Sequence, residues 1–173
     1  MATSLYDLSV TNYLQTLGGM EGFLGRGLAH FQENKIDPND IVETRLHPDM
    51  LPFRFQVLAT AHHSIGAIRG VKAGLFAPPA SLPPLDYAGL QKAVTEAREA
   101  LQQLTPAEVN TLEGKDVTFQ IRDTKIPFTA EGFVQSFSLP NFYFHATTAY
   151  DILRSKGVPL GKRDFLGRLR LKS

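Results

Sequence analysis

One stretch of the sequence decides the fold: Asp86–Leu104, DYAGLQKAVTEAREALQQL. Asp86 is a favourable N-cap residue for a helix that begins just after it. Apolar residues then recur in alternating steps of three and four, which places them along one face of an α-helix. We therefore predict a helix over residues 86–104 whose apolar seam packs against other helices. The seam comprises Tyr87, Leu90, Val94, Ala97, Leu101 and Leu104.

Three other segments show the same helical spacing of apolar residues. They cover about residues 5–32, 50–72 and 130–156. Inside the last of these, Pro140 lacks the N–H that a helical hydrogen bond needs, which predicts a kink near Ser136. With the helix over 86–104, the chain has four helical segments.

Five glycines interrupt the first of these helices. Each costs about 0.5–1 kcal/mol relative to alanine in a helix interior, so a compensating feature is expected. Gly18 and Gly22 lie four residues apart on one face, where another helix could approach closely. A break in the helix is the alternative explanation. The run is not a phosphate loop, because no strand precedes it and His30 stands where a third glycine is required.

Residues 116–129 change to a period of two, with apolar and polar residues alternating on both sides of Asp123-Thr124-Lys125. This pattern predicts a β-hairpin with one apolar face. Pro127 restricts its second strand to a sheet edge. Because two strands alone are marginally stable, the hairpin must pack on the helices. The prediction for residues 1–173 is thus a single all-α domain, a four-helix bundle with a small hairpin inserted before the last helix.

The composition supports a folded chain and excludes several classes of protein. Of 173 residues, 43% are hydrophobic and 20% charged, with 18 Lys and Arg against 17 Asp and Glu. The net charge of +1 argues against a nucleic-acid-binding protein. The sequence has no cysteine, which excludes disulfides, thiolate zinc sites and a cysteine nucleophile. The tail over 161–173 is basic, and we expect it to fold back on the acidic remainder of the chain.

The amino-terminal residues Met1–Asp7 have neither a basic nor an apolar region of a signal peptide. No segment approaches the roughly 18 uninterrupted apolar residues that a membrane span needs. The expected location is therefore the cytoplasm, without membrane association.

Four polar side chains fall on apolar faces of the predicted helices. Asn141 and His145 are one turn apart on the last helix, and Gln56 and His63 are two turns apart on the second. If the helices form a bundle, the two pairs can meet and build a ligand or metal site. Two other readings remain open: each histidine is an ordinary hydrogen-bonded core residue, or the four form a network that fixes helix register.

Several motifs resemble one family. They are Pro48-Asp49-Met50, Gln56, His63, the run Leu139-Pro140-Asn141-Phe142-Tyr143-Phe144-His145, Thr147-Thr148-Ala149-Tyr150, and Gly161-Lys162-Arg163-Asp164-Phe165-Leu166-Gly167. In these the chain resembles a bacterial and fungal family of unknown function, grouped with the DinB/YfiT-like metalloenzyme superfamily.

The resemblance implies a four-helix bundle, frequent dimerisation, and in better-known branches a nickel or zinc ion held by three histidines. One such histidine lies on the second helix and two lie at positions i and i+4 of the fourth. Here His63 and His145 match two of these ligands, but the position after His145 is Ala149 and the position before it is Asn141. His62 is a further imidazole, on another side of the helix. The three-histidine set is therefore altered.

Three functions follow as hypotheses. The principal one is an uncharacterised DinB-like protein with an altered polar site in the bundle core, formed by Gln56, His63, Asn141 and His145, which need not contain a metal and can serve as a ligand-binding site. The alternative is a divalent-metal-dependent transferase or hydrolase that uses a low-molecular-weight thiol, with His63 and His145 as ligands of nickel or zinc. The third is a structural homodimer whose inner polar network has no ligand. We expect a homodimer in each case.

Overall fold

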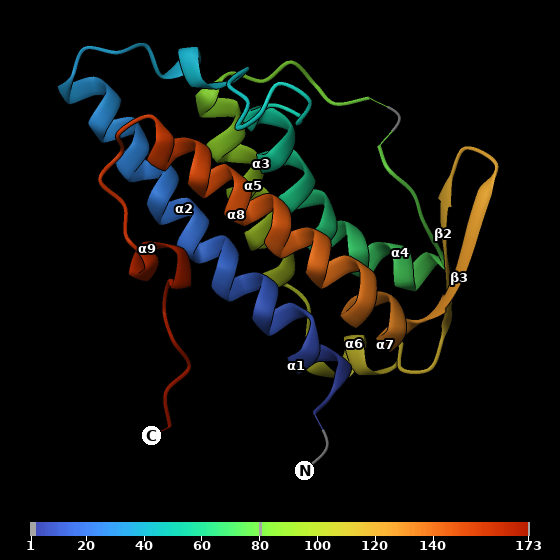
Figure 1. The fold of residues 1–173 in the computed structure, drawn as a ribbon. Helices are drawn as coiled ribbons and strands as arrows, with labels where there is room; N and C mark the ends of the chain where they lie inside the picture. Colours follow the sequence, from blue (N-terminus) through green and yellow to red (C-terminus); the bar gives the residue numbers. More distant parts are fainter. Residues whose placement is uncertain (1–2, 80, 173) are drawn as a thin grey trace.

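The computed structural model describes residues 3–79 and 81–172 (Figure 1). Its long helices are α2 (Val10–Glu33), α5 (Tyr87–Gln102) and α8 (Leu139–Ser155), together with the rod formed by α3 (Phe53–Ala61), the π-helical turn η2 (His62–Gly66) and α4 (Ala67–Ala73). Helices α2 and α3 each pack on both α5 and α8. The apolar core lies between these packed faces.

Helix α5 forms as the sequence predicts. The Asp86 carboxylate accepts a hydrogen bond from the Gly89 N–H at 2.8 Å and so caps the first turn. The helix ends at Gln102, two residues before Leu104, and a capping box between Thr105 and Glu108 starts the short helix α6 (Pro106–Asn110). The seam residues within the helix are buried: Tyr87, Leu90, Val94, Ala97 and Leu101.

The first predicted helix is divided in two. Helix α1 (Leu5–Leu8) ends just before Ser9, whose backbone angles of φ −112° and ψ −78° are distorted from those of a regular helix, and α2 then runs through all five glycines without a break. A short 3-10 helix, η1 (Pro38–Ile41), follows in the connection to α3. None of the described helices is long and apolar enough to cross a bilayer.

Close approach to α2 occurs at Gly19 and Gly27, so the prediction of Gly18 and Gly22 is wrong. A Cβ atom at Gly27 would lie 2.5 Å from the Tyr87 hydroxyl, and one at Gly19 would lie 2.5 Å from the Phe165 carbonyl oxygen. No other described part of the chain comes within 4 Å of a Cβ built at Gly22. The two close contacts lie on different faces of α2, since Gly19 meets the segment around Phe165 and Gly27 meets Tyr87 and Leu153.

Substituting alanine at two of these glycines is expected to change stability in opposite directions. Gly27→Ala displaces the Tyr87 hydroxyl from its 2.8 Å hydrogen bond to the Leu24 carbonyl, which should cost about 2 kcal/mol. Gly22→Ala is exposed and unobstructed, and should stabilise by about 0.5–1 kcal/mol. Urea denaturation followed by circular dichroism measures both. Equal effects of the two substitutions would contradict this packing.

The chain forms a small three-stranded sheet rather than an isolated hairpin. Strands β2 (Asp116–Ile121) and β3 (Thr124–Thr129) pair antiparallel as predicted, and β1 (Leu75–Phe76) pairs parallel with β2. The pairing of β1 puts Phe76 directly beside Phe119. The sheet thereby adds two aromatic side chains to one end of the helical layers.

Two π-helical turns interrupt the second and fourth predicted helices. The second helix contains η2, and in the fourth η3 (Val134–Ser138) separates α7 (Ala130–Phe133) from α8. The irregularity predicted near Ser136 is thus a π turn that ends two residues before Pro140. Such turns hold one residue more than an α-helical turn and recur at functional sites. Here both lie on the same side of the protein.

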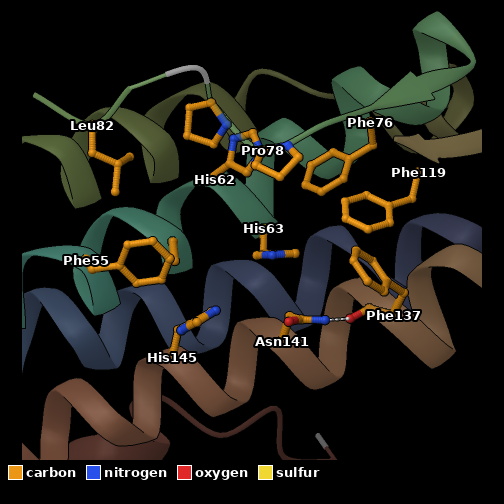
Figure 2. A pocket seen from close by; sticks show the side chains of 12 residues that line it. Phe55, His62, His63, Phe76, Pro78, Leu82, Phe119, Phe137, Asn141 and His145 are labelled. Carbon is orange, nitrogen blue, oxygen red and sulfur yellow. Dashed lines mark hydrogen bonds between the residues drawn. The ribbon is translucent and has the colours of Figure 1, made fainter. Parts of the chain in front are cut away.

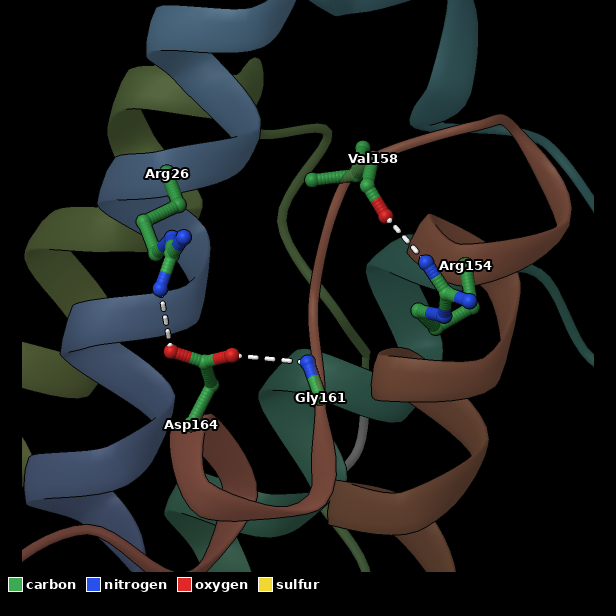
Figure 3. A network of polar contacts seen from close by, with 5 residues as sticks. All are labelled: Arg26, Arg154, Val158, Gly161 and Asp164. Carbon is green, nitrogen blue, oxygen red and sulfur yellow. Dashed lines mark hydrogen bonds and ion pairs between the residues drawn. The ribbon is translucent and has the colours of Figure 1, made fainter.

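The carboxy-terminal segment docks on α2 through helix α9 (Lys162–Leu166). Figure 3 shows the Asp164 carboxylate accepting hydrogen bonds from the Gly161 N–H and from the Arg26 guanidinium. These two hydrogen bonds hold the pKa of Asp164 below its usual value. The Arg154 guanidinium donates to the Val158 carbonyl at 2.9 Å, which closes the turn before α9. The first half of the basic tail is therefore folded onto the protein.

Candidate functional site

A cavity of about 260 Å³ lies between the two π turns and the sheet (Figure 2). Helices α3 and α8 form two of its sides, and strands β1 and β2 contribute Phe76 and Phe119. The connection after β1 covers it with two prolines and Leu82. The lining residues are Phe55, Ala59, His62, His63, Phe76, Pro78, Pro79, Leu82, Phe119, Phe137, Asn141 and His145.

The orientation of His145 is set from outside the cavity. Gln56 is buried behind it, and the Gln56 Nε2 donates to the Leu51 carbonyl at 2.8 Å. The Gln56 Oε1 therefore faces His145 and accepts a hydrogen bond from its Nδ1 at 2.8 Å. Nδ1 carries the proton, so Nε2 of the neutral ring has a free lone pair. Burial lowers the pKa of His145 to about 4, which keeps this ring neutral near pH 7.

His63 lies next to His145, with ring centroids 5.9 Å apart. Its Nδ1 is buried and has no hydrogen-bond partner among the described residues. Burial, and then the neighbouring imidazoles of His145 and His62, lower the pKa of His63 to about 3. Charging this ring inside the protein is thus strongly unfavourable.

The backbone of His63 is held by a buried chain of hydrogen bonds. The Ser138 hydroxyl donates to the His63 carbonyl at 2.7 Å and lies 2.8 Å from the Tyr13 hydroxyl. Because the serine proton is used on the carbonyl, the tyrosine donates to the serine. The chain links α2 to both π turns and fixes the part of η2 that carries His63.

His62 also lines the cavity, although the sequence places it on another side of the helix. Its Nε2 donates to the Ala77 carbonyl at 2.9 Å, and its ring stacks on Phe76 with centroids 4.7 Å apart. Burial lowers its pKa, and the hydrogen bond to Ala77 opposes that shift. His62 therefore holds the connection after β1 against the helix. Its second ring nitrogen, Nδ1, lies near Gly66.

The amide of Asn141 is partly used within its own helix. Its Nδ2 donates to the Phe137 carbonyl at 2.7 Å. Figure 2 shows the amide nitrogen turned toward Phe137 and the oxygen on the side of His145. The Asn141 Oδ1 is thus an acceptor at the cavity wall.

Comparison with models of known protein families identifies the family of this chain. A family model described as "Domain of unknown function (DUF1993)" matches residues 5–166. The chain belongs to the DUF1993 family. None of the functionally curated proteins compared with it matches significantly.

The fold of this DUF1993 protein is that of the DinB-like superfamily. A crystal structure of a DinB family member from Shewanella denitrificans superposes with a TM-score of 0.81. The two chains share 24% sequence identity over 98% of this chain and 95% of the other. This match confirms that the fold is DinB-like.

The donor set of this DUF1993 protein does not fit the three-histidine metal site expected for the superfamily. His63 and His145 supply two imidazoles, and Asn141 and Ala149 stand at the positions one turn before and after His145. Within residues 3–79 and 81–172, no group of three or more His, Cys, Asp or Glu side chains is arranged to share an ion. Two imidazoles alone hold a divalent ion weakly, because stable protein sites use at least three ligands.

The structure brings three of the four predicted residues to the cavity wall, and the fourth, Gln56, lies behind His145. Sequence reasoning missed the aromatic part of the wall. Phe55 lies beside the apolar stripe of its helix, and Phe76 and Phe119 meet only through the pairing of β1 with β2. The prolines that follow Phe76 are a signal of this wall in the sequence, since Pro78 and Pro79 belong to the connection that covers the cavity.

Proposed function

We propose that this protein binds a small organic molecule in the cavity between α3 and α8, without a metal ion. Gln56, His63, Asn141 and His145 form its polar site, within a DinB-type four-helix bundle. The observation that carries the proposal is the cavity itself. It is lined by aromatic side chains, and in it Gln56 orients a neutral His145 whose Nε2 lone pair has no partner within the site. A mostly apolar pocket with few oriented polar groups is the usual form of a ligand site.

The role of each residue follows from its contacts. Gln56 orients His145 and selects its tautomer, as described above. His145 and Asn141 present acceptor atoms to the ligand. His63 and the surrounding phenylalanines exclude water and contact the apolar part of the ligand, because burial keeps the His63 ring uncharged. The site is therefore built for binding and orientation.

Native mass spectrometry of protein purified without a histidine tag tests this proposal together with elemental analysis. We expect a bound organic molecule, or a rise in melting temperature with small aromatic compounds, and less than stoichiometric metal. The variant Phe119→Ala, which opens the cavity wall, should weaken binding, whereas Ile121→Ala, at the exposed end of the same strand β2, should not. Equal loss in both variants would contradict binding at the cavity.

One observation favours the alternative of a metal-dependent transferase or hydrolase acting with a low-molecular-weight thiol. Nδ1 of His63 is buried without a partner, and an imidazole held by an amide oxygen resembles an oriented metal ligand. Stoichiometric nickel or zinc that is lost in His63→Ala and His145→Ala would favour this alternative and overturn the metal-free proposal.

We also propose that the protein is a cytoplasmic homodimer. Phe144 is 57% exposed and Leu51 47% exposed, and the α2 face at Gly22 is open within the chain. These residues are apolar surface that a second copy of the chain would cover in a homodimer. Light scattering at several concentrations tests the homodimer, and a monomer throughout would exclude it.

A further inference from the structure

The chemistry of the cavity wall restricts what the ligand can be, and this inference rests on the proposed function. Three of the N–H groups at the wall already have defined partners. The Asn141 N–H is used on the Phe137 carbonyl, the His62 N–H on the Ala77 carbonyl and the His145 Nδ1–H on Gln56. His63 keeps one ring N–H, and its buried Nδ1 has no partner among the described residues. On the side of α8, what faces the cavity is therefore the His145 Nε2 lone pair and the Asn141 Oδ1. Both are acceptors, so a ligand bound to them must supply the donor.

The cavity is also uncharged. Among its twelve lining residues are no Asp, Glu, Lys or Arg, and its histidines remain neutral near pH 7 because burial opposes their protonation. A charged ligand would lose its hydration without gaining an ion pair. The wall therefore favours a neutral molecule over its anion.

The shape of the wall indicates an aromatic ligand. Phe76, Phe119 and Phe137 form a cluster in which the rings of Phe119 and Phe137 lie 4.5 Å apart, centroid to centroid, and Phe55 stands against His145 at 5.6 Å. The volume of about 260 Å³ is below the roughly 300–1,000 Å³ of drug-sized sites. It exceeds the roughly 150 Å³ of an apolar cavity that holds benzene. A ligand with a single substituted aromatic ring therefore fits the volume of this cavity.

We propose that the ligand is a neutral aromatic molecule bearing a hydroxyl or ring N–H, which it donates to Nε2 of His145. The ring lies among the phenylalanines, and Asn141 Oδ1 accepts a second donor where the molecule has one. Figure 2 shows the imidazole of His145 and the Asn141 amide on the same side of the cavity, opposite Phe76 and Phe119. The arrangement distinguishes phenols from their ethers and from carboxylates of equal size.

Three probes of similar size test this proposal: phenol, anisole and benzoate. Titration of ¹⁵N-labelled protein, followed by its NMR spectrum, gives the three affinities. We expect phenol to bind about two- to tenfold more tightly than anisole, the range of one net hydrogen bond, and benzoate not to bind where phenol saturates. Phenol should also shift the ¹⁵N signal of His145 Nε2, which anisole should leave in place.

The variant His145→Leu keeps the volume and removes the acceptor, so phenol and anisole should then bind equally. The ligand comparison on the unaltered protein needs no variant and therefore stands even if His145→Leu fails to fold. Equal binding of phenol and anisole, or preference for benzoate, would overturn this inference while leaving a ligand-binding cavity in place. Absence of binding by all three would overturn the inference and count against the proposed function as well.

Discussion

Acidification from pH 7 to pH 5 is expected to lower the free energy of unfolding by roughly 2–4 kcal/mol through His63 and His145. The unfolded chain takes up a proton on each imidazole as the pH falls below about 6.5. The folded protein holds both rings neutral, since burial lowers their pKa values to about 3 and about 4. The unfolded state therefore binds more protons throughout this interval and gains stability relative to the folded state.

Urea denaturation at half-unit steps of pH measures this effect. The double variant His63→Gln, His145→Gln removes both imidazoles, so the slope of its stability against pH should be smaller, by a difference that approaches two protons at pH 5. The contribution of the two histidines should level off below about pH 3, where both rings also become protonated in the folded protein. An unchanged pH dependence in the double variant would show that these rings are not held neutral in the folded protein.

Ser138→Ala is expected to destabilise the protein by about 3 kcal/mol, because it leaves two buried polar groups without partners. The Ser138 hydroxyl accepts from Tyr13 and donates to the carbonyl of His63, and both Ser138 and Tyr13 are fully buried. Tyr13→Phe should cost less, about 1 kcal/mol, since Ser138 can still donate to the carbonyl. Adding Tyr13→Phe to Ser138→Ala should recover part of the loss by removing one unpartnered group.

The matched control is Ser136→Ala, in the same π turn. The Ser136 hydroxyl is exposed and donates to the Gly132 carbonyl within its own helical segment. Its removal should change stability by no more than about 0.5 kcal/mol. Thermal and urea denaturation of the three single variants decide the comparison, and similar effects at Ser136 and Ser138 would contradict a structural role for the buried chain.

The sequence predicts the local elements well where one segment contains all the information. The seam from Tyr87 to Leu101 and the cap at Asp86 define α5, and alternation around Asp123 defines β2 and β3. Strand β1 cannot be predicted in this way, because it has two residues and pairs with a segment about forty residues later. The position of Phe76 in the cavity wall cannot be predicted for the same reason.

The polar half of the candidate site is predictable and the apolar half is not. Helical spacing places Asn141 and His145 one turn apart on the same face. The tautomer of His145 instead depends on Gln56, and the orientation of Gln56 depends on the Leu51 carbonyl. The choice of Gly27 over Gly22 for close approach likewise depends on which face of α2 meets Tyr87. Such facts belong to packing between elements, which the helical spacing alone does not contain.

The π turn at His62–Gly66 determines how length differences between relatives should be interpreted. Because the turn holds one residue more than an α-helical turn, a relative shorter by one residue here can keep α3 and α4 continuous. Because the π turn absorbs the extra residue, its loss would leave α3 and α4 on the faces with which they already pack. The side chains within the turn, His63 among them, would change direction relative to the cavity, while the core of each helix kept its register. A single-residue gap in an alignment at this point thus marks a change of ligand chemistry within an unchanged architecture.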